Sequence, residues 1–179
     1  NILLDFQVAA VKLAAQLLHR RGGVLLGDVV GLGKTLMATA VAKIFQEDDG
    51  SNTIIVCPPS LIPNWEIHIH RYQLIGRVVS LGKVIEELGG DRKPFCRTLI
   101  IDESQNLRNR ESKRYKALKA YIDEVNPRVI LISATPFNKH FTDLSNQLRL
   151  FVDEDQDLHV RPEAFFKSYA QEGKTEMDA

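Results

Sequence analysis

Cysteine, tryptophan and methionine are scarce in this sequence, and neither sign of charge is in excess. The 179 residues include two cysteines, one tryptophan and two methionines, and 23 lysines and arginines balance 23 aspartates and glutamates. Two cysteines do not make a disulfide framework in a chain of this length, which favours a reducing, intracellular setting. The balanced totals do not indicate a strongly basic nucleic-acid-binding protein, although local basic patches stay open.

Long apolar runs are absent as well. The longest uncharged stretch, residues 50–65, contains Pro58, Pro59 and Pro63 and cannot be a membrane span, so no membrane partner is expected. Hydrophobic residues make up 44% and charged residues 26% of the chain, which is ordinary globular composition. We expect residues 1–179 to form a single domain.

Short apolar segments alternate with segments of helical periodicity, a pattern typical of α/β proteins. The apolar segments are rich in Val and Ile and lack alternation, as in central parallel strands covered on both faces. The expected strands are 24–27, 53–57, 77–80, 98–102 and 128–133, and the expected helices are about 5–19, 34–46, 61–72, 84–88, 142–151 and 162–170, with one more before the last strand. The sequence predicts a three-layer domain with a mainly parallel sheet and helices on both faces.

The opening helix has a clear apolar stripe. Phe6, Ala10, Leu13 and Leu17 recur at spacings of four, three and four, which predicts that they form its buried face.

The strongest chemical signal is residues 27–35, Gly-Asp-Val-Val-Gly-Leu-Gly-Lys-Thr, between an expected strand and a helix. Gly31 and Gly33 let the backbone fold around an anion, and the start of the helix adds its positive dipole end. Lys34 would reach the β- and γ-phosphates, and the Thr35 hydroxyl would bind Mg²⁺. A plain glycine-rich turn is the alternative, but Lys-Thr in this context favours nucleotide binding.

Two adjacent acids end the fourth expected strand. Asp102 would lie at the same sheet edge as the phosphate loop, where it can hold Mg²⁺ through water. Glu103 can polarise the attacking water as a general base. Acids are also common where a strand meets solvent, but together with the phosphate loop they favour a hydrolase.

The order of motifs resembles the first RecA-like lobe of helicase superfamily two, and within it the Swi/Snf-type DNA-translocating ATPases. Residues 4–7 resemble the adenine-reading segment, and residues 28–35 resemble the DEMGLGKT loop, which accounts for Asp28 where the strict phosphate-loop pattern has glycine. Residues 56–65 resemble the segment that contacts one nucleic-acid strand. Residues 102–105 stand at the DEAH-box position, and residues 131–136 are close to the Ser/Thr-Ala-Thr-Pro motif that couples hydrolysis to lobe movement.

The resemblance implies a role for each matching residue and a P-loop site for ATP and Mg²⁺. Gln7 would hydrogen-bond adenine, and Thr35 and Asp102 would hold the metal. The implied catalytic residues are Lys34, Asp102, Glu103 and Gln105; the nucleotide-binding residues are Gln7, Asp28, Val30, Gly31, Leu32, Gly33, Lys34, Thr35 and Leu36; the coupling residues are Ser133, Ala134 and Thr135; and the nucleic-acid residues are Pro58, Ser60, Asn64 and Ser80.

The resemblance further implies an ATP-dependent, helicase-like translocase on duplex DNA. ATP would be hydrolysed at the interface with a C-terminal RecA-like lobe that is absent from this chain and supplies arginine fingers. We therefore expect weak or no hydrolysis by this lobe alone. The implied location is intracellular, in the nucleoid region of the cytoplasm or in the nucleus.

The chain departs from the family pattern at two positions. Val29 replaces the usual Glu, and Gln105 replaces the His of the box. We expect Gln105 to hydrogen-bond toward Ser133 or the γ-phosphate and so keep the coupling role. A stand-alone P-loop NTPase independent of nucleic acid and a catalytically silent binding module are the two alternative functions.

Several other residues have ordinary structural interpretations. A basic run is expected mainly as a solvated helix face, with a nucleic-acid contact as the alternative. Trp65 is expected in the core rather than stacked on a base, and His68 and His70 are not expected to bind metal. Cys57 and Cys96 are expected to be small buried hydrophobic residues. The basic run comprises Arg108, Arg110, Lys113, Arg114, Lys116 and Lys119.

Overall fold

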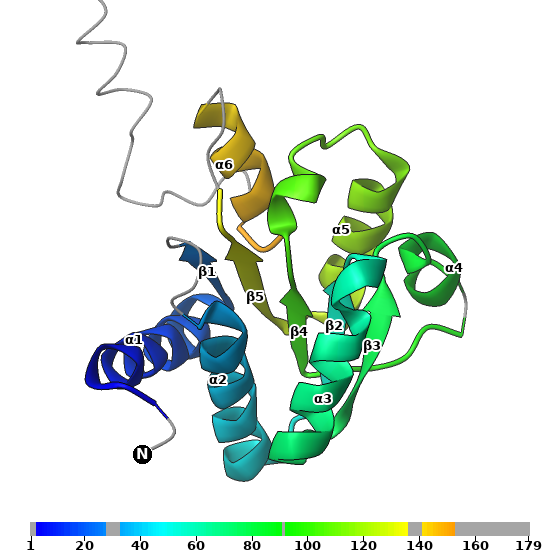
Figure 1. Ribbon diagram of the computed structural model, residues 1–179. Helices are drawn as coiled ribbons and strands as arrows, with labels where there is room; N and C mark the ends of the chain where they lie inside the picture. Colours follow the sequence, from blue (N-terminus) through cyan, green and yellow to red (C-terminus); the bar gives the residue numbers. More distant parts are fainter. Residues whose placement is uncertain (1–2, 28–32, 91, 136–140, 153–179) are drawn as a thin grey trace, which may run out of the picture.

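The computed structural model describes residues 3–27, 33–90, 92–135 and 141–152, which form an α/β domain (Figure 1). Five strands make one parallel sheet in the order β1-β5-β4-β2-β3. The expected parallel sheet is therefore confirmed. The strands are β1 (Gly23–Gly27), β2 (Thr53–Cys57), β3 (Gly76–Ser80), β4 (Thr98–Ile101) and β5 (Arg128–Ser133).

Helices cover both faces of the sheet, so the expected three layers are present (Figure 1). One face carries α1 (Asp5–Arg21), α2 (Lys34–Asp49) and α3 (Ile62–Tyr72). The other carries α4 (Val84–Leu88) and α5 (Lys113–Val125). Two 3-10 helices, η1 (Pro59–Leu61) and η2 (Ser104–Leu107), follow strands β2 and β4, and α6 (Phe141–Leu148) packs against η2.

Strand residues alternate between the two hydrophobic cores. Ile55, Ile100 and Ile130 are in register on neighbouring strands and are buried on the side of α1, α2 and α3. Val56, Ile101 and Leu131 are in register in the same way on the side of α4 and α5. Burial on both faces is the reason why these strands have no polar alternation.

The buried face of α1 differs from the expected one. Phe6 and Leu13 are 48% and 57% exposed, whereas the buried residues of this helix are Gln7, Val11, Ala14 and Leu18. The two sets have the same spacing and differ by one position, so apolar periodicity favoured the wrong one. The buried set includes a glutamine because its amide is held beside the start of α2.

The boundaries of some elements also differ from the expected ones. Helix α3 begins at Ile62, because Pro59–Leu61 form η1, and Pro63 lies in the first helical turn, where proline is tolerated. Strand β4 ends at Ile101, and α6 ends at Leu148. The helix expected at 162–170 lies outside the described residues. Across the described ranges, no helix has the length and apolar character that a membrane crossing requires.

Candidate functional site

The carboxyl ends of all five parallel strands meet at one edge of the sheet, which is where open α/β sheets bind ligands. Strands β1, β5 and β4 are neighbours, with Gly27 opposite Ser133 and Ile101 opposite Leu131. Strands β2 and β3 continue the same edge, with Cys57 opposite Ser80. The expected nucleotide residues therefore lie on one half of the edge and the expected nucleic-acid residues on the other.

The start of α2 has the geometry of an anion site. Gly33 has φ 77° and precedes Lys34 and Thr35, which form the first turn. This turn contains no acidic residue. Its backbone N–H groups and the helix dipole favour a bound anion, as expected for the end of a phosphate loop.

Gln7 reaches the start of α2 from α1. Its Oε1 atom accepts a hydrogen bond of 2.9 Å from Leu4 N. A Cβ atom added at Gly33 would lie 2.6 Å from Gln7 Nε2. Glycine is favoured at position 33 by its positive φ, and a Cβ atom there would also displace the Gln7 amide. The residue expected to read adenine is therefore beside the phosphate-binding turn.

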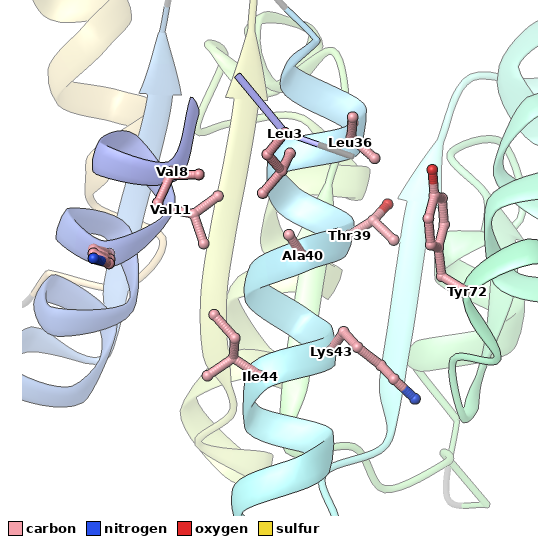
Figure 2. A pocket seen from close by; sticks show the side chains of 10 residues that line it. Leu3, Val8, Val11, Leu36, Thr39, Ala40, Lys43, Ile44 and Tyr72 are labelled. Carbon is pink, nitrogen blue, oxygen red and sulfur yellow. The ribbon is translucent and has the colours of Figure 1, made fainter. Parts of the chain in front are cut away.

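Four predicted nucleotide-binding residues, Asp28, Val30, Gly31 and Leu32, lie outside the described residues. A fifth predicted nucleotide-binding residue, Leu36, lies in the first turns of α2. Its side chain lines an apolar groove of about 360 Å³ between α1, α2 and Tyr72 of α3 (Figure 2). The groove contains no acidic side chain among its lining residues, and Lys12 and Lys43 are its charged members. It is separate from the Asp102 carboxylate.

Asp102 follows β4 and is only 6% exposed. Its Oδ2 atom accepts a hydrogen bond of 2.8 Å from Trp65 Nε1, and its Oδ1 atom accepts one of 2.8 Å from Glu103 N. Burial raises the pKa of Asp102 above its ordinary value, while both hydrogen bonds and the charge of Lys34 act in the opposite direction. The charge of Lys34, in the first turn of α2, therefore acts on the Asp102 carboxylate after β4.

Glu103 has a backbone conformation that side chains rarely adopt. Its φ and ψ are 52° and 47°, in the left-handed region. The other two non-glycine residues of this kind in the described chain, Gln73 and Asn126, end helices. Glu103 instead stands between a buried strand and η2. Strained residues of this kind are found at functional sites when the surrounding structure holds them in place.

Gln105 joins Glu103 to the coupling segment. Its Nε2 atom donates to Glu103 Oε2, and its Oε1 atom accepts a hydrogen bond of 2.7 Å from Ser133 Oγ. The same Ser133 oxygen accepts a bond of 3.1 Å from Thr135 N. The expected contact between Gln105 and Ser133 is thus present. Ala134, the remaining coupling residue, is half-buried.

The four expected nucleic-acid residues lie around the ends of β2 and β3. Pro58 follows β2 directly, and Leu81 N, next to Ser80, donates to Cys57 O at 2.8 Å. Ser60 and Asn64 are exposed. The Ser80 hydroxyl accepts from Gly82 N at 3.3 Å. The structure therefore brings these residues to one stretch of the sheet edge.

Several contacts at the site could not be found from sequence. Trp65 is buried as expected, but its bond to Asp102 was not predicted. A buried indole N–H needs an acceptor, and this requirement was the available signal. His68 Nδ1 lies 3.1 Å from Thr39 Oγ1. Beyond β4, Ser104 Oγ donates to Gln147 Oε1 at 2.7 Å and ties η2 to α6.

The remaining residues mostly have the structural roles expected of them. Cys57 and Cys96 are fully buried, and burial raises the pKa of Cys57 to about 12. In the basic run, Lys116 and Lys119 pair with Glu111 and Asp123 at 2.6 and 2.5 Å. Among the described residues, no group of three or more His, Cys, Asp or Glu side chains could hold a metal. Mg²⁺ needs fewer protein ligands because it keeps water and phosphate oxygens, which fits Thr35 and Asp102.

The fold and the site together define a RecA-like α/β domain of the nucleotide-binding class. Its fold matches that of a solved structure, the Sulfolobus solfataricus SWI2/SNF2 ATPase core in complex with dsDNA, with a TM-score of 0.74 at 20% identity. The match covers 85% of this chain and 36% of that one.

Sequence comparison gives the family. Residues 6–88 match the model of the SNF2-related domain. A SWI/SNF-related, matrix-associated, actin-dependent regulator of chromatin subfamily A-like protein 1 from Bos taurus is 31% identical over 187 residues, and its Caenorhabditis elegans homologue is 28% identical over 155. The alignments cover 94% and 74% of this chain but only 18% and 22% of those relatives. This chain is a Swi/Snf-type, N-terminal RecA-like lobe of helicase superfamily two.

Proposed function

We propose that the chain is the ATP-binding lobe of an ATP-dependent, double-stranded DNA translocase. The observation that carries the proposal is the meeting of the Lys34–Thr35 turn with Asp102 and Glu103 at one sheet edge. Gln105 adds a direct path from Glu103 to Ser133. A strand end that merely meets solvent needs neither the buried carboxylate nor this path.

In this proposal each residue has a distinct task. Lys34 binds the β- and γ-phosphates, and Thr35 and Asp102 hold Mg²⁺, which neutralises charge on the phosphates when bound. Glu103 orients and deprotonates the attacking water. Gln105 holds the Glu103 carboxylate and transmits its state to Ser133. Gln7 recognises adenine beside Gly33.

We propose duplex DNA and a C-terminal RecA-like lobe as the partners. Support for DNA comes from the similar Sulfolobus core, which was solved in complex with dsDNA. The exposed Ser60 and Asn64 side chains and the end of β3 would contact one strand. The second lobe would complete the nucleotide site with arginine side chains, a contribution of about 10³- to 10⁵-fold in related reactions. The location that goes with a duplex-DNA partner is intracellular, in a nucleus or in the nucleoid region of a cytoplasm.

The test is ATP hydrolysis by a protein that contains both lobes, measured with duplex DNA, single-stranded DNA, RNA and no nucleic acid. We expect strong stimulation by duplex DNA. Lys34→Ala should abolish nucleotide binding, and Glu103→Gln should keep binding but lower turnover by at least about 10²-fold. Lys12→Ala, an exposed lysine on α1, is the matched control. Equal turnover without nucleic acid would instead identify a stand-alone NTPase.

A further inference from the structure

Helix α3 connects the two halves of the sheet edge. It follows η1 directly, so Ser60 and Asn64, two of the four expected nucleic-acid residues, lie at its amino-terminal end. Its inward side chains contact the nucleotide half of the edge at two separate points. Among the described residues, these contacts come from Trp65 and His68, one helical turn apart.

The first contact is made by Trp65. Its side chain is fully buried, and its Nε1 atom donates to Asp102 Oδ2 at 2.8 Å. Asp102 receives its other hydrogen bond from Glu103 N, so the indole is a principal constraint on the rotation of the carboxylate. A shift of α3 along its axis would lengthen or bend this bond and turn the Asp102 carboxylate, which would hold the metal.

The second contact runs through His68 and Thr39. The Thr39 hydroxyl donates to Thr35 O at 2.7 Å, so it accepts from His68 Nδ1 at 3.1 Å, since a hydroxyl has one proton. Figure 2 shows the Thr39 side chain on α2 directed toward α3, where Tyr72 is drawn. Thr35 is the other expected metal-binding residue, so both residues are connected to α3, Asp102 through its carboxylate and Thr35 through its backbone carbonyl by way of Thr39.

We propose that α3 is a positioning element that couples nucleic-acid contact at its amino-terminal end to the metal–nucleotide site, through Trp65 to Asp102 and through His68 and Thr39 to Thr35. The inference rests on the proposed function. Trp65 and Thr39 are positioning residues, because they bond to the Asp102 carboxylate and to the Thr35 backbone rather than to the substrate, and His68 acts through Thr39. Contacts that orient metal ligands commonly change metal affinity or activity by about 10- to 100-fold when removed.

The test measures the coupling itself on the 179-residue chain. The dissociation constant of a non-hydrolysable ATP analogue with Mg²⁺ is determined by calorimetry with and without saturating duplex DNA, and the ratio is the coupling factor. Trp65→Phe keeps an aromatic ring but removes the donor. We expect it to raise the Mg²⁺ concentration for half-saturation about tenfold and to bring the coupling factor to about one, while DNA affinity stays within about twofold.

Two further sets of variants separate positioning from folding. Thr39→Val should reduce the coupling factor, and Thr39→Ser, which keeps the hydroxyl, should restore it. Tyr72→Phe keeps the ring that packs 5.5 Å from the His68 ring and removes only a hydroxyl that takes part in neither hydrogen bond, so it should change nothing. Because Trp65 is the one tryptophan of the chain, its emission should also shift when the Mg²⁺ complex binds and stay constant when the nucleotide is added with a chelator.

The outcomes distinguish this inference from the function on which it rests. Wild-type coupling in both Trp65→Phe and Thr39→Val would refute the role of α3 while leaving nucleotide and DNA binding in place. Absence of nucleotide and DNA binding in the wild-type chain would overturn the proposed function and the coupling with it. If Trp65→Phe fails to fold, the Thr39 pair decides.

Discussion

The left-handed conformation of Glu103 predicts that the site reduces the stability of the fold. Its φ of 52° is unfavourable for any residue with a Cβ atom, by about 1 to 2 kcal/mol in this region. Glycine avoids this penalty but loses about 0.5 to 1 kcal/mol through its more flexible unfolded state. The E103G variant should therefore be more stable than E103A by about 0.5 to 1 kcal/mol.

This comparison isolates the backbone, because both variants lack the carboxylate and its bond from Gln105. The expected difference corresponds to a melting temperature about 1 to 4 °C higher for E103G. Thermal unfolding can be followed by the emission of Trp65. The matched control is Ala120, an exposed residue in the middle of α5, where Ala→Gly should cost about 1 kcal/mol. An E103G variant that is no more stable than E103A would refute the strain argument.

Three further predictions follow from the same structure. Gly33→Ala should destabilise the protein more than Gly22→Ala. Both positions have positive φ, but only an alanine at position 33 would place its Cβ 2.6 Å from Gln7 Nε2. Denaturant unfolding of the two variants checks this prediction. Hydrogen bonds from Ser51 and Arg128 lower the pKa of Asp49, so the stabilisation by its carboxylate is complete above about pH 4 and is lost as pH falls below that. The wild type should therefore be more stable than Asp49→Asn near neutral pH, by less than about 1 kcal/mol because the ion pair is partly exposed. Denaturant unfolding should show this difference disappearing in acid. Cys57, fully buried and with a pKa of about 12, should resist alkylation at pH 8 until the chain unfolds, and rapid labelling of the native protein would contradict this.

The sheet could be predicted from sequence because its strands are covered on both faces and contain continuous Val and Ile. Residues 53–57 and 128–133 were bounded correctly for that reason. The same argument brought Lys34, Thr35 and Asp102 together, since parallel strands end at a common edge. The face of α1 could not be settled in this way, because a glutamine held beside Gly33 occupies a position that apolar periodicity assigns to a hydrophobic residue.

The contacts of α3 lie beyond sequence reasoning for a different physical reason. Trp65 and Asp102 are 37 positions apart, and His68 and Thr39 are 29 apart, so no local spacing relates them. The burial of Trp65 and Asp102 nevertheless makes their pairing necessary. A buried indole without an acceptor and a buried carboxylate without donors would both be costly, and one hydrogen bond of 2.8 Å satisfies both groups. A phenylalanine at position 65 would keep an aromatic ring in the core but would leave Asp102 with a single donor, Glu103 N, among the described residues. The tryptophan is therefore better explained by the carboxylate that it orients than by the core that it fills.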